Sequence, residues 1–193
     1  MPQIERSSLM TLEAYARERP QFRAKVMAHK KNRTVSLGDH MTLAFEDELT
    51  IRYQVQEMLR VERIFEAQGI EDELAAYNPL IPDGRNLKAT MMLEFPDPDE
   101  RRQWLAGLIG VEDKIWIEVA GYKRVWAIAD EDLERENEQK TSSVHFLRFE
   151  LTDDMAQALR RGAGLAIGVD HPRYTAKLDA PPAVRDALAH DLA

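Results

Sequence analysis

Several segments of the chain alternate apolar with polar residues, and this period of two constrains the fold more than any other feature. In LKATMMLEF, residues 87–95, every odd-numbered position is apolar, as expected for a strand with one buried face. Other segments with strand character lie near 114–120, 124–129, 143–151 and 165–169. Because several are joined by short, hairpin-type links, we expect one mainly antiparallel sheet of about five strands.

Helical segments lie between these strands. Residues 98–109 give the clearest signals: Asp97 can cap the helix, Pro98 suits its first position, and Gly110 can end it. We expect this helix against one face of the sheet. Residues 9–33 suggest two helical pieces that divide at Pro20, because proline cannot continue a helix from its interior. Strands mixed with helices in this way predict an α+β fold.

The N-terminal part adds a hairpin to its helices. In TVSLGDHMTLAF, residues 34–45, two alternating runs flank a Gly-Asp turn. We therefore predict a single domain over residues 1–193, in which a helical and hairpin part at 9–76 packs on a sheet-containing part at 87–193. The acidic run DEDLERENEQK, residues 130–140, suggests a solvated loop or helical turn.

One residue of the helix predicted at 50–68 is unusual. Successive helix residues are about 100° apart, so Ile51, Val55, Met58 and Phe65 form an apolar stripe, and Glu62 falls within it. A carboxylate buried there would have to be paired, protonated or metal-bound. A structural ion pair with an arginine is one interpretation of Glu62, and a metal site is another.

His145 is the second candidate for a metal ligand. It shares one face of the strand at 143–151 with apolar residues, and we expect that strand to be central. A hydrogen-bonded core histidine is the plain interpretation. If the long helix packs on that face, Glu57, Glu62 and His145 could together bind a divalent metal such as iron, manganese or zinc. Their spacing matches no recognised metal motif.

Two further segments are candidates for partner or anion contact. The basic cluster from His29 through Lys30 to Arg33 ends a predicted helix, where cations favourably meet the helix dipole, and it could also bind an anion. In the loop YNPLIPDGRN, residues 77–86, Leu80 and Ile81 lie between prolines, and they suggest either core residues or a contact surface. Asn78 and Asp83 of this loop join the same candidate set.

Composition excludes several classes of protein. The formal charge of −8 argues against general nucleic-acid binding, which needs a basic face. The chain contains no cysteine, so a disulfide framework, a catalytic thiolate and a cysteine-bound iron–sulfur cluster are excluded. The N-terminus lacks the apolar core of a signal peptide, and no apolar run approaches a membrane span. We expect a cytoplasmic protein.

The longest distinctive runs also carry a family resemblance. AHKKNRTVSLG, FEDELTIRYQVQEMLRVERIFE, ELAAYNPLIPDGRNLKATMMLEF and SSVHFLRFEL together resemble the bacterial family known as domain of unknown function 3501, from about Leu9 to the end. Genes of that family often lie beside those of rubrerythrin and of an iron–sulfur oxidoreductase. The resemblance therefore implies a role near peroxide defence or electron transfer, and it identifies no catalytic residue.

Three functions follow as expectations. The first is an accessory or adaptor protein that docks to such a redox partner, an iron–sulfur oxidoreductase or a rubrerythrin-like protein; the absence of cysteine and of any catalytic motif favours it. The second is a metal-binding protein or metalloenzyme built on Glu57, Glu62 and His145. The third is a small-ligand sensor whose pocket is lined by the basic cluster and the loop at 77–86.

Overall fold

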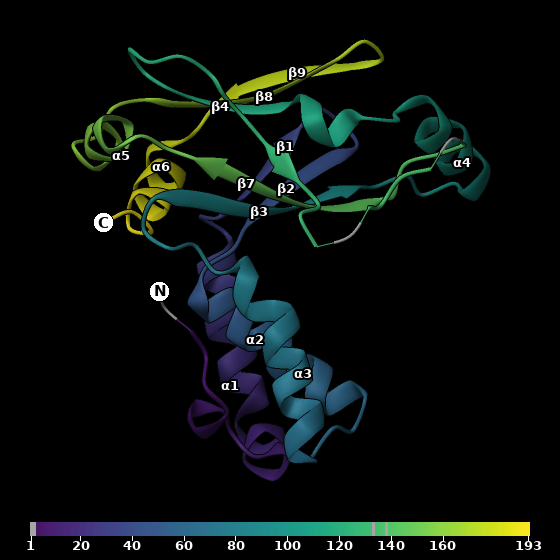
Figure 1. Cartoon of the computed structure of the whole chain (residues 1–193), viewed down its shortest axis with the longest axis vertical. Coiled ribbons are helices and arrows are strands. Elements are labelled where there is room, and N and C mark those ends of the chain that lie inside the picture. Colours follow the sequence, from purple (N-terminus) through teal and green to yellow (C-terminus); the bar gives the residue numbers. More distant parts are fainter. Residues whose placement is uncertain (1–2, 133, 138) are drawn as a thin grey trace.

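A helical unit projects from a larger unit that contains two β-sheets (Figure 1). The computed structural model describes residues 3–132, 134–137 and 139–193. Each unit has its own apolar core: one cluster lies among the helices and the other lies between the sheets. The chain enters the helical unit twice, before and after the first β-hairpin.

Three helices make up the helical unit: α1 (Leu12–Lys30), α2 (Glu48–Val61) and α3 (Ala67–Tyr77). Two short 3-10 helices, η1 (Arg6–Ser8) and η2 (Asn78–Leu80), flank them. The buried stripe of α2 consists of Ile51, Val55 and Leu59, at the spacing of three to four residues that places side chains on one helix face. These residues pack with Ile4, Leu74 and Ile81.

The division of the first helix at Pro20 is wrong. The structure has one continuous helix, α1, with Pro20 inside it. A proline removes the hydrogen bond to the carbonyl four residues earlier, which here belongs to Ala16. Both Pro20 and Ala16 are exposed, so water can hydrate that carbonyl, while Tyr15 and Val26 are buried on the opposite side and hold the helix together.

The strands form two antiparallel sheets. The first has the order β1-β2-β3-β7-β6, with β1 (Thr34–Leu37), β2 (Met41–Phe45), β3 (Asn86–Leu93), β7 (Val144–Glu150) and β6 (Ile128–Ala129). The second has the order β5-β4-β8-β9, with β5 (Val125–Trp126), β4 (Ile115–Val119), β8 (Leu165–His171) and β9 (Tyr174–Asp179). Apolar residues from both sheets share one core.

The α+β class and the antiparallel pairing are confirmed, but the expected single sheet is two. The segment expected as one strand at 124–129 explains the difference. Its first half, β5, pairs with β4, and its second half, β6, pairs with β7. Between them Ala127 is buried and bonds to the Ile115 carbonyl, so the chain crosses here from one sheet to the other. The first hairpin also joins the sheet, because β2 pairs with β3.

The remaining helices lie at the ends of the two-sheet unit (Figure 1). The helix α4 (Pro98–Gly107), capped by Asp97 as expected, lies at one end and not across a sheet face. At the other end are α5 (Asp153–Arg160) and α6 (Pro182–Ala189), which contact each other. A third 3-10 helix, η3 (Val111–Lys114), leads into β4. Among the described residues, no helix has the length and apolar character needed to cross a membrane.

Candidate functional site

A groove of about 550 Å³ lies between the helical unit and the outer face of the five-stranded sheet. Its walls include Met58 of α2, Tyr77 of α3 and Leu80 of η2. Its floor includes Lys88 of β3 and Phe146 of β7. Because strand neighbours alternate between faces, the residues beside Lys88 and Phe146 point the other way, into the core. The strand pattern therefore gives β3 and β7 one face for the core and one for the groove.

A second hollow, of about 1050 Å³, adjoins the groove and shares part of its lining, including Pro79, Lys88, Glu131 and Arg148. Arg148 stands directly opposite Lys88 in the strand register. Two nitrogens of Arg148 each donate to a Glu131 oxygen at 2.9 Å, so this guanidinium is held by a bidentate ion pair.

Lys88 is held differently. Its Nζ donates to the Pro79 carbonyl at 2.5 Å, and none of the described carboxylates forms an ion pair with it. Burial lowers the pKa of Lys88, as expected for an ammonium that has lost part of its hydration. The floor of the groove therefore presents a partly desolvated cation beneath an apolar wall.

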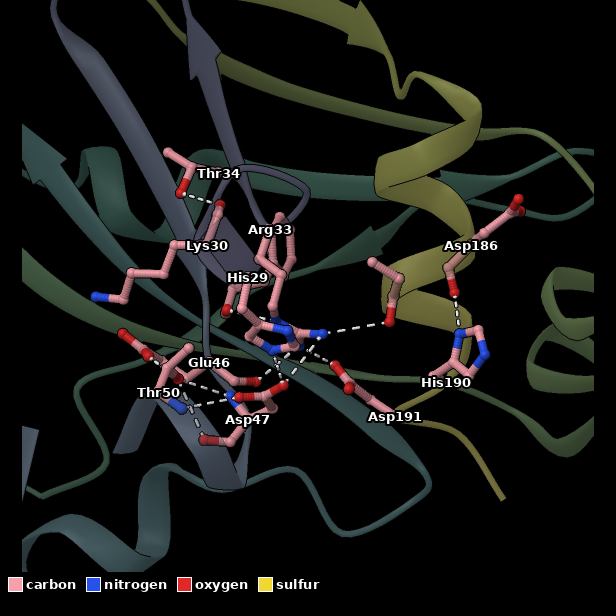
Figure 2. Close-up of polar contacts among 12 residues, drawn as sticks. His29, Lys30, Arg33, Thr34, Glu46, Asp47, Thr50, Asp186, His190 and Asp191 are labelled. Atoms are coloured by element: carbon pink, nitrogen blue, oxygen red, sulfur yellow. Dashed lines mark hydrogen bonds and ion pairs between the residues drawn. The ribbon is translucent and has the colours of Figure 1, made fainter. Parts of the chain in front are cut away.

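A buried polar junction joins the helical unit, the first sheet and the C-terminal segment (Figure 2). Its centre is Arg33, which is only 2% exposed. Nε and Nη2 of Arg33 donate to the carbonyls of Phe45 and Glu46, at 3.0 and 3.1 Å. Nη1 donates to the carbonyl of Ala187 at 3.2 Å, and Nη2 also pairs with the Asp191 carboxylate. One guanidinium thus ties together segments that are distant in sequence.

Two carboxylates share this cation. Asp47 caps α2 by accepting from the Thr50 amide at 2.9 Å, and its Oδ2 lies 2.6 Å from His29 Nε2 and 3.5 Å from Arg33 Nη1. Burial alone would raise the pKa of Asp47, but the Arg33 charge and the hydrogen bonds to Thr50 and His29 hold it below its usual value. Asp191 is deeper, and burial raises its pKa to about 6 even though Arg33 opposes the shift.

A second buried cluster surrounds His145 on the core side of β7. Asp130 Oδ2 lies 2.5 Å from His145 Nδ1. On the other side of the ring, His145 Nε2 lies 2.9 Å from Thr141 Oγ1, 3.1 Å from the Ser142 carbonyl and 3.9 Å from Glu112 Oε2. His145 is 0% exposed and Glu112 is 5% exposed. The cluster joins β7 to η3 and to the segment that precedes β7.

The expected metal set of Glu57, Glu62 and His145 is not brought together. The helix α2 ends at Val61, and Arg63 then adopts a left-handed conformation with φ 55°. The chain turns there, which leaves Glu62 exposed and Phe65 73% exposed. The prediction that Glu62 is buried is therefore wrong, because the helix stops about one turn before the apolar period in the sequence ends.

Glu57 has a structural partner in the helical unit. It accepts hydrogen bonds from the Tyr15 hydroxyl at 2.7 Å and from Arg19 Nε at 2.6 Å. The Arg19 hydrogen bond, together with those from Tyr15 and Arg60, lowers the pKa of Glu57 to about 2 although burial opposes the shift. Within the part of the chain that the structure describes, His145 is the only one of the three expected metal residues that lies in a cluster of possible ligands, and its neighbours there are Glu112 and Asp130.

The residues of the expected anion-binding cluster at the end of α1 do not form one site in the structure. Arg33 is buried, and the carboxylates of Asp47 and Asp191 already contact it. His29 contacts Asp47, whereas the Lys30 side chain points away from the junction (Figure 2). The internal carboxylates therefore take the place that an external anion would need at Arg33.

The loop at 77–86 does line the hollows, but its residues have different roles. Leu80 lines the groove, whereas Ile81 is 5% exposed and belongs to the helical core. The Asn78 amide clamps the backbone of Ile4, with hydrogen bonds of 2.9 and 3.1 Å. Asp83 accepts from the Arg85 amide at 3.0 Å and stabilises the turn before β3. The expected contact surface is thus reduced mainly to Leu80.

Apart from Glu112 of η3, the residues around His145 come from the acidic run at 130–140 and the positions beside it, which the sequence analysis does not single out. We expected that run to be solvated, yet Asp130 and Glu136 are half-buried; positions 133 and 138 of the run lie outside the described residues. The sequence does offer a local signal at Asp130, which directly follows the apolar run VWAIA, residues 125–129. No sequence pattern connects Asp130 with Glu112, since only the fold brings them together.

The comparisons with known proteins agree with the sequence resemblance. A protein of unknown function from Burkholderia pseudomallei, known from its crystal structure, is 53% identical, with a TM-score of 0.95 and full coverage of both chains. Curated proteins give no match. The family described as "Protein of unknown function (DUF3501)" matches residues 3–192. Because that match spans almost the whole chain, this protein belongs to that family.

Proposed function

We propose that this protein is an accessory or adaptor protein of a bacterial redox system and that the groove beneath η2 is where its partner docks. The observation that carries the proposal is the chemistry of the groove. Apolar side chains of Met58, Tyr77 and Leu80 line the groove together with Lys88, whose ammonium donates to the Pro79 carbonyl and forms no direct ion pair with a described residue. Such a surface suits a segment that offers both an apolar side chain and a carboxylate.

The class of partner comes from the family resemblance, which implies an iron–sulfur oxidoreductase or a rubrerythrin-like protein. The groove is suited to a short protein segment, because the hollow of about 1050 Å³ adjoins it and extends the surface along η2. An apolar anchor against Leu80 would supply binding energy. A carboxylate near Lys88 would restore the electrostatic stabilisation that the ammonium lost on burial.

The test is purification of the tagged protein from its native host under anaerobic conditions, with copurifying proteins identified by mass spectrometry. The groove variants are Leu80→Ser and Lys88→Gln. We expect both to reduce recovery of a specific redox protein by at least about tenfold, which corresponds to about 1.4 kcal/mol of binding free energy. Their melting temperatures should stay close to that of the wild-type protein.

The matched control is Phe65→Ser, which removes an exposed apolar side chain at the far end of the helical unit. If this variant loses the partner while the groove variants still recover it, docking occurs at that end of the helical unit, which would contradict the proposal. A free small molecule that binds the groove and raises the melting temperature, with no copurifying protein, would instead favour the sensor function.

A further inference from the structure

The His145 cluster contains more negative than positive charge. Carboxylates of Glu112 and Asp130 flank the ring, the Glu136 carboxylate lies beside that of Glu112, and Arg135 pairs with Asp130 at 3.2 Å. Acidic groups crowded in a buried place require a proton or a cation for charge balance. This charge balance is one observation that points to a bound cation.

The two sides of the His145 ring have different surroundings. On the Nδ1 side, Asp130 Oδ2 lies at 2.5 Å, and its other oxygen accepts from the Phe146 amide at 3.0 Å. A carboxylate that is fixed in this way sets the tautomer and orientation of the ring, as in carboxylate–histidine–metal arrangements. Nε2 is then the ring nitrogen available to a metal ion.

Oxygen atoms gather on the Nε2 side. The Thr141 hydroxyl, the Ser142 carbonyl and the Glu112 carboxylate lie 2.9, 3.1 and 3.9 Å from Nε2. Ligand atoms that are each about 2.1 Å from one ion are about 3 Å apart at right angles and about 4 Å apart when opposite. The three separations fall within this range, so small side-chain movements would allow all of these atoms to contact one ion.

We propose that Nε2 of His145 and the Glu112 carboxylate bind a divalent first-row metal ion, with Thr141 and the Ser142 carbonyl as further oxygen ligands. One imidazole with several oxygens suits manganese, iron or zinc. Glu136 is half-buried beside Glu112, and its carboxylate accepts from the Gly110 amide at 2.8 Å. The ion holds the segment before β7 against η3, and Asp130 acts as a positioning residue for the ring.

The test uses the full-length protein after treatment with a chelator. Mn²⁺, Zn²⁺ and, without oxygen, Fe²⁺ are added one at a time, and binding is followed by calorimetry and by the melting temperature. We expect one equivalent of at least one of these ions to bind and to raise the melting temperature. We also expect Co²⁺, added as a spectroscopic probe, to give a visible absorption spectrum typical of nitrogen and oxygen ligands.

Variants separate this site from adventitious binding at acidic side chains. Glu112→Gln should weaken binding at least about tenfold, and Asp130→Asn should weaken it by about 10- to 100-fold through loss of ring orientation. The matched control is Glu134→Gln, an exposed position of the same acidic run, which should bind as the wild type does. If a variant fails to fold, the stoichiometry and Co²⁺ spectrum of the wild-type protein still decide the question.

Absence of saturable binding by the wild-type protein at millimolar concentrations of all four ions would overturn the proposal. Equal binding by Glu112→Gln and Glu134→Gln would overturn it too. Glu112 and His145 do not line the groove, so the comparison of Glu112→Gln with Glu134→Gln does not depend on partner docking.

Discussion

Replacement of Arg33 by methionine tests whether the junction in Figure 2 holds the helical unit to the rest of the fold. Methionine keeps much of the aliphatic volume of arginine and removes its charge and all its donors. The carbonyls of Phe45, Glu46 and Ala187 then lose a hydrogen bond each, and the carboxylate of Asp191 loses its cation. Arg33 itself is only 2% exposed, so water has little access to these carbonyls and to the carboxylate.

The expected cost is about 3–5 kcal/mol of unfolding free energy, the range for a broken buried ion pair. Three carbonyls without a partner would by themselves cost about 1–3 kcal/mol each, but two effects reduce the total. Uptake of a proton by Asp191 removes its stranded charge, and local relaxation admits some water. We therefore expect the total to stay within the ion-pair range.

The assay is urea denaturation at pH 7.5 of four proteins: wild type, Arg33→Met, Asp191→Leu and the double variant. Removal of both partners leaves no stranded charge, so the double variant should be more stable than the sum of the single losses predicts, by at least about 1 kcal/mol. A loss below about 1 kcal/mol in Arg33→Met, or strict additivity in the cycle, would refute the view that this junction is a buried, coupled ion pair.

Three further predictions test other parts of the structure. Burial raises the pKa of Asp191 from 3.8 to about 6, so this group should stabilise the fold by about 3 kcal/mol below pH 4 and lose that contribution as the pH rises through 6. Urea titrations from pH 4 to 8 should show the unfolding free energy falling with pH, and Asp191→Asn should flatten this dependence. Glu62→Gln should change the unfolding free energy by less than about 0.5 kcal/mol, since the side chain is exposed; a loss of several kcal/mol would mean that it is buried after all. Gly168→Ala would place its Cβ 2.2 Å from the Trp116 ring and should destabilise by about 1–3 kcal/mol or more, whereas Gly164→Ala, with ordinary contacts, is the control in thermal melts.

Local chemistry made most of the individual elements predictable. Asp97 caps α4, as expected from its side chain. The same local chemistry acts at Thr152, which caps α5, and at the two prolines at 181 and 182, which precede or open α6. Alternation placed His145 on the buried face of β7 together with Leu147 and Phe149, which the structure confirms. Each of these predictions depends on residues within a few positions of one another, which is the range over which caps and strand alternation act.

The errors arose where the decisive contact was distant or where a helix ended without a glycine. The helix α2 stops at Val61, and Arg63 takes the left-handed conformation that glycine usually provides. No residue type marked the stop, so the apolar period appeared to continue through Glu62 to Phe65. Similarly, alternation shows that a segment is a strand but not which sheet it joins, and β5 and β6 differ only in their distant partners.

The strand β7 joins the two proposed sites through neighbouring residues. His145 points into the core, and Phe146 lines the groove on the opposite face, because successive strand residues alternate. The carboxylate of Asp130 forms hydrogen bonds with both the ring of His145 and the amide of Phe146. Arg135 pairs with this carboxylate and also lies over the Phe146 ring, 4.6 Å from its centre. A change that moves Asp130 therefore alters both the ring that would bind a metal and one side of the groove. For this reason, metal occupancy and partner recovery should be measured on the same preparation of each variant.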